Sequence, residues 1–221
     1  IEKDNNERRR TNLISKLTRS APIMKLAIVV PFTSKDWDLV ANTLSNWTSL
    51  GHTCPSISKL AYKPVDLVFW YNKDFNRSSI SRIFRKTVGE ILLRDGLRDC
   101  FDKVQFLSAN LSKIDDGYPN GASNQFYQLF LDKVPGFTDR KYDYMAWLEH
   151  DVFPIRSGFI DKLVSEVTFE GEFIVKGSIH RGERLAPDKD NSDWVAHING
   201  NALYKLNSDV MVDLLRKVMR V

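Results

Sequence analysis

The sequence predicts one α/β domain, with a mostly parallel central sheet and helices on both of its faces. Short apolar runs rich in β-branched and aromatic residues alternate with segments whose apolar residues recur at helical spacing. The chain has 221 residues, 43% of them hydrophobic, which is enough to bury one sizeable core. No low-complexity linker divides it and no internal repeat is visible, so we expect a single domain over residues 25–221 after a charged N-terminal extension or helix over residues 1–24.

The first strand and helix set the pattern. Residues 25–32, "KLAIVVPF", form a continuous apolar run, which is typical of a strand buried on both faces. In residues 34–50, apolar side chains recur every three or four positions, which predicts a helix with Ser34 as its N-cap and Gly51 at its end.

The same alternation continues to the end of the chain. The sequence predicts further strands at 65–72, 103–111, 142–151 and 172–179, and further helices at 78–96, 120–134 and 157–167, the second of these capped by Asn120 or Ser123. Residues 180–197 are polar and without periodicity, and a loop of that length in a compact domain is usually functional or disordered. The last 13 residues have a helical pattern, and the whole chain reads as a piece of a longer protein.

Composition narrows the possible functions. Lys and Arg exceed Asp and Glu by 32 − 28 = 4, a mild excess that is compatible with an anionic ligand but requires none. We expect no nucleic-acid partner, because no basic stripe interleaves with aromatic residues. No apolar run approaches the ~20 residues of a membrane-spanning helix. Cys54 and Cys100 are not in a C-x-x-C spacing, and we expect from them neither a metal site nor a disulfide framework.

One predicted strand ends in three ionisable residues. "AWLEHDVFPIRSGF", residues 146–159, places Glu149, His150 and Asp151 after an apolar run. On a strand, Glu149 and Asp151 would point to one face and His150 to the other. Paired carboxylates suit Mg²⁺ or Mn²⁺, with the phosphates of a substrate completing the coordination. The alternative is a charged strand tip in water.

The acid-x-Asp end of this strand resembles the metal-binding D-x-D signature of GT-A-fold glycosyltransferases, here in an E-x-D form. The resemblance covers residues 25 to about 206. It implies a nucleotide-diphosphate-sugar donor, a glycan or other hydroxyl acceptor, and Mn²⁺ or Mg²⁺ at Glu149 and Asp151. It leaves open the sugar, the base, the stereochemistry, and a cytoplasmic or Golgi-lumenal location.

The resemblance also implies further site residues. Each has a plain structural alternative: a strand end for the first loop, a polar turn for the second, a helix N-cap for the third and a tight turn for the fourth. The implied contacts to nucleotide or sugar are Pro31, Phe32 and Thr33; Asn72 and Asp74; Gly121, Ser123 and Asn124; and Gly200 and Asn201.

Three residues at or near the end of the long polar segment complete the hypothesis. His197 is a candidate third metal ligand, against the alternative of a hydrogen-bonded core histidine. Asp193 is the candidate catalytic base and Trp194 a candidate sugar-stacking residue, against the alternative that Asp193 is solvated and Trp194 only anchors the loop. Two other functions stay open: a nucleotidyltransferase, disfavoured because "VVPFTSKDW" lacks glycine, and a non-catalytic sugar- or protein-binding module.

Overall fold

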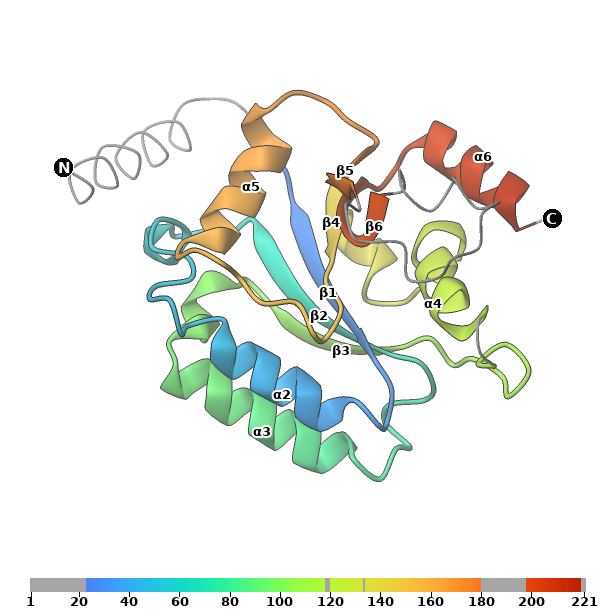
Figure 1. The fold of residues 1–221 in the computed structure, drawn as a ribbon, viewed down its shortest axis with the longest axis horizontal. Coiled ribbons are helices and arrows are strands. Elements are labelled where there is room, and N and C mark those ends of the chain that lie inside the picture. Colours follow the sequence, from blue (N-terminus) through green and yellow to red (C-terminus); the bar gives the residue numbers. More distant parts are fainter. Residues whose placement is uncertain (1–22, 118–119, 133, 180–197, 220–221) are drawn as a thin grey trace, which may run out of the picture.

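A computed structural model describes residues 23–117, 120–132, 134–179 and 198–219 (Figure 1). Within them lies a six-stranded sheet of order β3-β2-β1-β4-β6-β5. Strands β1 to β4 run parallel, and β6 is antiparallel to both of its neighbours, so the predicted mostly parallel sheet is confirmed. The strands are β1 Leu26–Phe32, β2 Val65–Tyr71, β3 Val104–Ser108, β4 Tyr144–Trp147, β5 Val175–Ile179 and β6 Ile198–Lys205.

Helices cover both faces of the sheet, as the sequence predicts. Alternate side chains of β1 explain this: Leu26 and Ile28 enter one core cluster, while Ala27 and Val29 enter a second on the opposite face. The first cluster packs against α2, α3 and α5 and the second against α4 and α6 (Figure 1). The helices are α2 Trp37–Asn46, α3 Ser81–Arg94, α4 Asn120–Leu131, α5 Phe159–Phe169 and α6 Asp209–Val218, with short 3₁₀ turns η1 Ile57–Lys59, η2 Leu97–Cys100 and η3 Thr138–Arg140.

The strand order reverses between β1 and β4. From β1 the chain moves outward through β2 to β3, and it then returns to place β4 on the other side of β1. The carboxyl ends of these parallel strands meet at one edge, since β1 pairs with β2 in register up to Phe32 with Tyr71. Ligands of open α/β sheets bind in the crevice at such a reversal, which directs attention to this edge.

Several predicted boundaries were wrong near this edge. Strand β4 ends at Trp147, four residues before the predicted end. Helix α2 begins at Trp37, and Asp36 rather than Ser34 occupies its cap position. Helix α4 begins at Asn120, so Ser123 lies inside it and does not cap it. The expected turn around Gly200 is instead part of β6, because β5 pairs with this part of the strand, Gly177 with Ala202 and Ile179 with Ile198, and no local pattern reveals that pairing.

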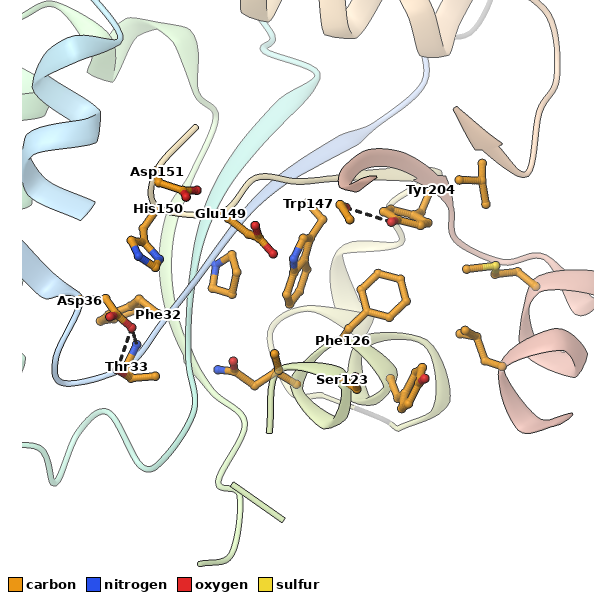
Figure 2. A pocket seen from close by; sticks show the side chains of 18 of the residues that line it. Phe32, Thr33, Asp36, Ser123, Phe126, Trp147, Glu149, His150, Asp151 and Tyr204 are labelled. Atoms are coloured by element: carbon orange, nitrogen blue, oxygen red, sulfur yellow. Dashed lines mark hydrogen bonds between the residues drawn. The ribbon is translucent and has the colours of Figure 1, made fainter. Parts of the chain in front are cut away.

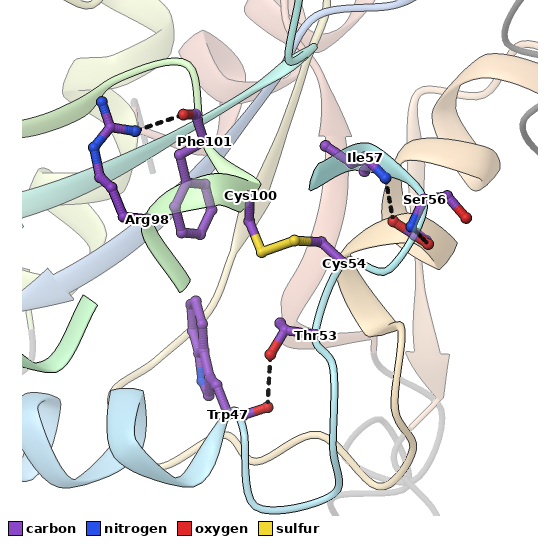
Figure 3. The surroundings of a disulfide bond; sticks show 9 residues. Trp47, Thr53, Cys54, Ser56, Ile57, Arg98, Cys100 and Phe101 are labelled. Carbon is purple, nitrogen blue, oxygen red and sulfur yellow. Dashed lines mark hydrogen bonds between the residues drawn. A yellow bond between two sulfur atoms is a disulfide. The ribbon is translucent and has the colours of Figure 1, made fainter. Parts of the chain in front are cut away.

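The prediction for the cysteines was also wrong. Cys54 and Cys100 form a disulfide with a Cα–Cα distance of 5.6 Å, which joins the loop after α2 to η2 (Figure 3). They are 46 residues apart in sequence, and only the packing of two β/α units brings them within bonding distance. Both side chains are buried, at the amino ends of the strands and away from the edge described above.

A buried carboxylate ties the amino ends of the strands together. Asp66 in β2 is fully buried and accepts hydrogen bonds from Arg140 Nε (2.8 Å), the Tyr142 hydroxyl (2.6 Å) and the Lys103 backbone amide (3.0 Å). Arg140 also pairs with Asp102. Burial and the hydrogen bond to Asp66 raise the pKa of Tyr142, which therefore stays a neutral donor. In the part of the chain that the structure describes, no helix is long and apolar enough to cross a membrane.

Candidate functional site

A cavity of ≈ 590 Å³ opens at the carboxyl ends of β1 and β4, at the reversal of strand order (Figure 2). Strand β6 and helices α4 and α6 complete its walls. The described residues that line it are Pro31, Phe32, Thr33, Asp36, Ala122, Ser123, Gln125, Phe126, Tyr127, Trp147, Glu149, His150, Asp151, Val175, Gly200, Tyr204, Met211, Leu214 and Leu215.

The three ionisable residues form a turn at the mouth of this cavity. The chain leaves β4 at Trp147, and the Val152 amide donates to the Glu149 carbonyl (3.1 Å), which closes the turn. The Thr43 hydroxyl of α2 donates to the carbonyl of His150 and so fixes the turn against that helix. Alternation along a strand therefore no longer applies. His150 lines the same cavity as Glu149 and Asp151, whereas the strand pattern predicted that it would face away.

Asn201 holds Glu149 from the neighbouring strand. Its Oδ1 accepts from the Glu149 backbone amide (2.7 Å), and its Nδ2 donates to Glu149 Oε2 (3.2 Å). Gly200 lies beside this pair, and a Cβ added there would lie 3.8 Å from Glu149 Oε1, an ordinary contact. The oxygen and the nitrogen of the Asn201 side-chain amide thus both bond Glu149, and the sequence did not predict this contact.

Tyr204 forms the wall next to Glu149. Its hydroxyl donates to the Gly200 carbonyl (2.9 Å), and its ring is almost fully buried (Figure 2). Burial, and secondarily the charge of Glu149, raise the pKa of Tyr204 to about 12. The residue is therefore a neutral hydrogen-bond donor at physiological pH.

The end of β1 supplies the opposite side of the mouth. Pro31, Phe32 and Thr33 all line the cavity, and their contact with a nucleotide stays a prediction. Phe32 is also a core residue, stacked on Phe84 with a centroid distance of 4.6 Å. Asp36 Oδ2 accepts from the Thr33 amide (3.0 Å) and hydroxyl (2.7 Å), which shapes this loop.

Five predicted ligand contacts do not line the cavity, namely Asn201, which contacts Glu149, and the four residues that follow. Asn72 donates from Nδ2 to Asp116 (2.7 Å), and Asp74 accepts from the backbone amides of Asn76 and Arg77 in its own turn. Asn124 Nδ2 donates to the Asp115 carbonyl (2.8 Å). A Cβ at Gly121 would lie 2.9 Å from the Asp116 carbonyl oxygen, so glycine there permits a close approach of two backbone segments. The structure thus gives each of these residues a local role.

The side of the cavity formed by α4, α6 and the two aromatic residues beside the acidic turn, Trp147 and Tyr204, is mostly apolar. The Phe126 ring lies 5.3 Å from that of Trp147 and 4.9 Å from that of Tyr204, in edge-to-face arrangements (Figure 2). Met211, Leu214 and Leu215 of α6 complete this end. Their helical or strand spacing is the same as that of core residues, so no sequence pattern indicated that they would line a cavity.

The acidic turn provides at most two carboxylates to a cation. Among the described residues, no group of three His, Cys, Asp or Glu side chains comes together to hold a metal ion. Glu149 and Asp151 nevertheless line one cavity, and Mg²⁺ is commonly bound by one or two carboxylates together with substrate phosphates. The donor set fits such a cation only with a phosphate ligand present.

The remaining candidates cannot be placed. Asp193, Trp194 and His197 lie outside the described residues, so their assignment as base, sugar contact and metal ligand stays a prediction.

Comparison of the sequence with known proteins identifies no family for the chain. No protein-family model matches the chain, and no curated protein matches it. Among solved structures it is similar to the X-ray structure of the mannosyltransferase Ktr4p from S. cerevisiae, with a TM-score of 0.43 and 12% identity. The match covers 80% of this chain and 49% of that one, so the chain spans about half the length of that structure.

Proposed function

We propose that this domain is a glycosyltransferase that moves a sugar from a nucleotide-diphosphate sugar to a hydroxyl acceptor, with Mn²⁺ or Mg²⁺ bound at Glu149 and Asp151. The observation that carries the proposal is the acidic turn at the mouth of a cavity placed where the strand order reverses. A pair of carboxylates facing a ligand crevice suits a cation that bridges to phosphates.

The residues of the cavity have distinct roles under this proposal. Glu149, oriented by Asn201, and Asp151 would bind the cation, which supplies Lewis-acid stabilisation of the leaving diphosphate. Pro31, Phe32 and Thr33 would contact the nucleoside, with Ser123 and Gly200 nearby on the cavity wall. Inverting transfer would also need a base within hydrogen-bond reach of the acceptor hydroxyl, and Asp193 is our candidate.

Calorimetric titration tests the proposal directly. UDP and GDP are titrated into the purified protein with Mn²⁺, and again with EDTA. We expect micromolar binding of one nucleotide that EDTA abolishes, and we expect Asp151→Asn to abolish it while the circular dichroism spectrum is unchanged. Asp38→Asn is the matched control, because Asp38 is an exposed carboxylate on α2 that does not line the cavity.

Other results would select the alternatives. Binding that survives both EDTA and Asp151→Asn would refute the metal role and favour a binding module. Preferential binding of nucleoside triphosphates, with release of pyrophosphate, would favour a nucleotidyltransferase.

A further inference from the structure

The two ends of the cavity differ in chemistry. The end formed by β1 and the acidic turn carries Thr33, Asp36, Glu149, His150 and Asp151, all of which have polar or charged side chains. The other end is formed mostly by aromatic and aliphatic side chains from α4, β4, β6 and α6. Helix α4 also contributes two polar residues to the lining, Ser123 and Gln125, and the Gln125 side chain donates to the Trp70 carbonyl (3.4 Å). The hydroxyl of Tyr204, a polar atom at this end, already donates to the Gly200 carbonyl (2.9 Å).

Helix α6 makes the apolar end open to solvent on one side. Ser208 caps the helix by accepting from the Met211 amide (3.3 Å), and Met211 and Leu215 then point into the core. Leu214 also lines the cavity but is 51% exposed. Exposed apolar side chains precede and follow it by one turn, at Val210 and Val218. The apolar surface therefore continues from inside the cavity onto the outer face of α6.

We propose that the apolar end binds the non-reacting part of the acceptor, and that this part is an aryl or alkyl group. The inference rests on the proposed function, which places the diphosphate at Glu149 and Asp151. The nucleoside has hydrogen-bonding edges and hydroxyl groups that match the polar end. The acceptor is then the substrate left for the apolar end, and a pocket lined by apolar side chains favours an apolar group.

The expected difference in affinity between aryl and methyl glycosides follows from the apolar area of the aryl ring. Burial of roughly 100 Å² of apolar surface at about 25 cal/mol per Å² corresponds to an affinity gain of at least ~10-fold. We therefore expect 4-nitrophenyl glycosides to bind at least ~10-fold more tightly than methyl glycosides of the same sugar.

The experiment compares these two probe series on three proteins. Binding is measured by saturation-transfer NMR in the presence of the diamagnetic ion Mg²⁺ and the nucleotide that binds, with a panel of common hexoses and xylose. The proteins are the wild type, Leu214→Gln, and Val210→Gln as the matched control, because Val210 is 63% exposed on the same helix but does not line the cavity. We expect Leu214→Gln to remove most of the aryl preference and Val210→Gln to retain it.

Nucleotide titration of the same samples separates the two proposals. Nucleotide binding with no aryl preference, or with a preference that Leu214→Gln leaves intact, would overturn the acceptor inference alone. A dimer of the wild type that Leu214→Gln dissociates would overturn it in favour of a second copy of the chain at this surface. Failure of every nucleotide to bind would overturn the proposed function and the acceptor role with it.

Discussion

At the scale of single residues, Asn201 and Glu149 are joined by two hydrogen bonds. The side chain of Asn201 contacts both the backbone amide and the carboxylate of Glu149, across the gap between β6 and the turn after β4. A carboxylate restrained in this way loses less conformational entropy when it binds a cation. Asn201 is thus a positioning residue for Glu149.

Asn201→Ala should weaken Mn²⁺ binding in the presence of nucleotide by about 3- to 10-fold, since each lost hydrogen bond to a charged group is worth on the order of 1 kcal/mol. Electron paramagnetic resonance of free Mn²⁺ measures this without any need for turnover. Asn207→Ala is the control, because Asn207 bonds the Tyr142 carbonyl far from the turn. Equal Mn²⁺ affinity in wild type and Asn201→Ala would show that the contact is only structural.

Tyr204 gives the protein a specific sensitivity to alkaline pH. Burial and the Glu149 charge raise its pKa to about 12, whereas a tyrosine in the unfolded chain titrates near pH 10. Above pH ~10 the unfolded state therefore loses this proton before the folded state does. The free energy of unfolding then falls as the pH rises from about 10 to 12, and the stability contribution of the neutral hydroxyl is fully present only below this window.

Urea unfolding at pH 9, 10 and 11 tests this assignment. Tyr204→Phe has no ionisable hydroxyl at this position, so its stability should decline less steeply with pH than that of the wild type. The other tyrosines contribute equally to both proteins and cancel in the comparison. Parallel curves would contradict the shifted pKa of Tyr204.

At the scale of elements, the disulfide joins two consecutive β/α units. Cys54 follows α2 and Cys100 ends η2, so the bond closes a loop that contains β2 and α3. Loop-closure entropy for a separation of 46 residues predicts a stabilisation of up to about 4 kcal/mol. A disulfide of this kind persists in oxidising compartments.

The double variant Cys54→Ser/Cys100→Ser should therefore unfold with a free energy about 2–4 kcal/mol lower than that of the wild type in urea. Its nucleotide affinity should not change, since the bond lies at the amino ends of the strands and the cavity at their carboxyl ends. Unchanged stability would mean that the unfolded chain between residues 54 and 100 is already restricted without the disulfide. A change in nucleotide affinity would mean that the two edges of the sheet are coupled.

At the scale of the whole molecule, the sequence predicted what depends on local pattern. The continuous apolar runs of β1 and β2 and the helical spacing of α2 to α5 correctly predicted the sheet and its two layers of helices. The sequence predicted "LEHD" at the end of a strand, whereas its position at the reversal of strand order is known from the structure.

What the sequence did not predict depends on long-range contacts. Four such contacts join segments at least 46 residues apart. They are the pairing of β6 with β4, the disulfide, the buried Asp66–Arg140 pair and the contact of Asn201 with Glu149. No periodicity marks such a pair. The apolar end of the cavity was missed for a related reason, because a side chain that lines a cavity has the same spacing as one that fills the core.

The amino edge of the sheet contains a buried ion pair, and its carboxyl edge contains the proposed binding site. Asp66→Asn breaks a buried ion pair at the amino edge and should lower the free energy of unfolding by about 3 kcal/mol, since Arg140 would remain partly buried with Asp102 as its remaining carboxylate partner. Glu90→Gln, which breaks the exposed pair with Lys86, is the control and should cost less than about 1 kcal/mol.

Ligand binding distinguishes the effects of substitutions at the two edges of the sheet. Nucleotide with Mn²⁺ at ~100-fold its dissociation constant stabilises a folded protein by about 2.7 kcal/mol, or roughly 5–10 °C in Tm for a chain of this size. We expect Asp66→Asn to keep this ligand-induced shift from a lower starting Tm, and Asp151→Asn to keep the starting Tm and lose the shift. The double variant should show the sum of both effects, because sites this far apart without shared partners act independently. If Asp66→Asn also removes the ligand-induced shift in Tm, the amino edge of the sheet takes part in nucleotide binding. That result would contradict the assignment of stability to one edge and binding to the other.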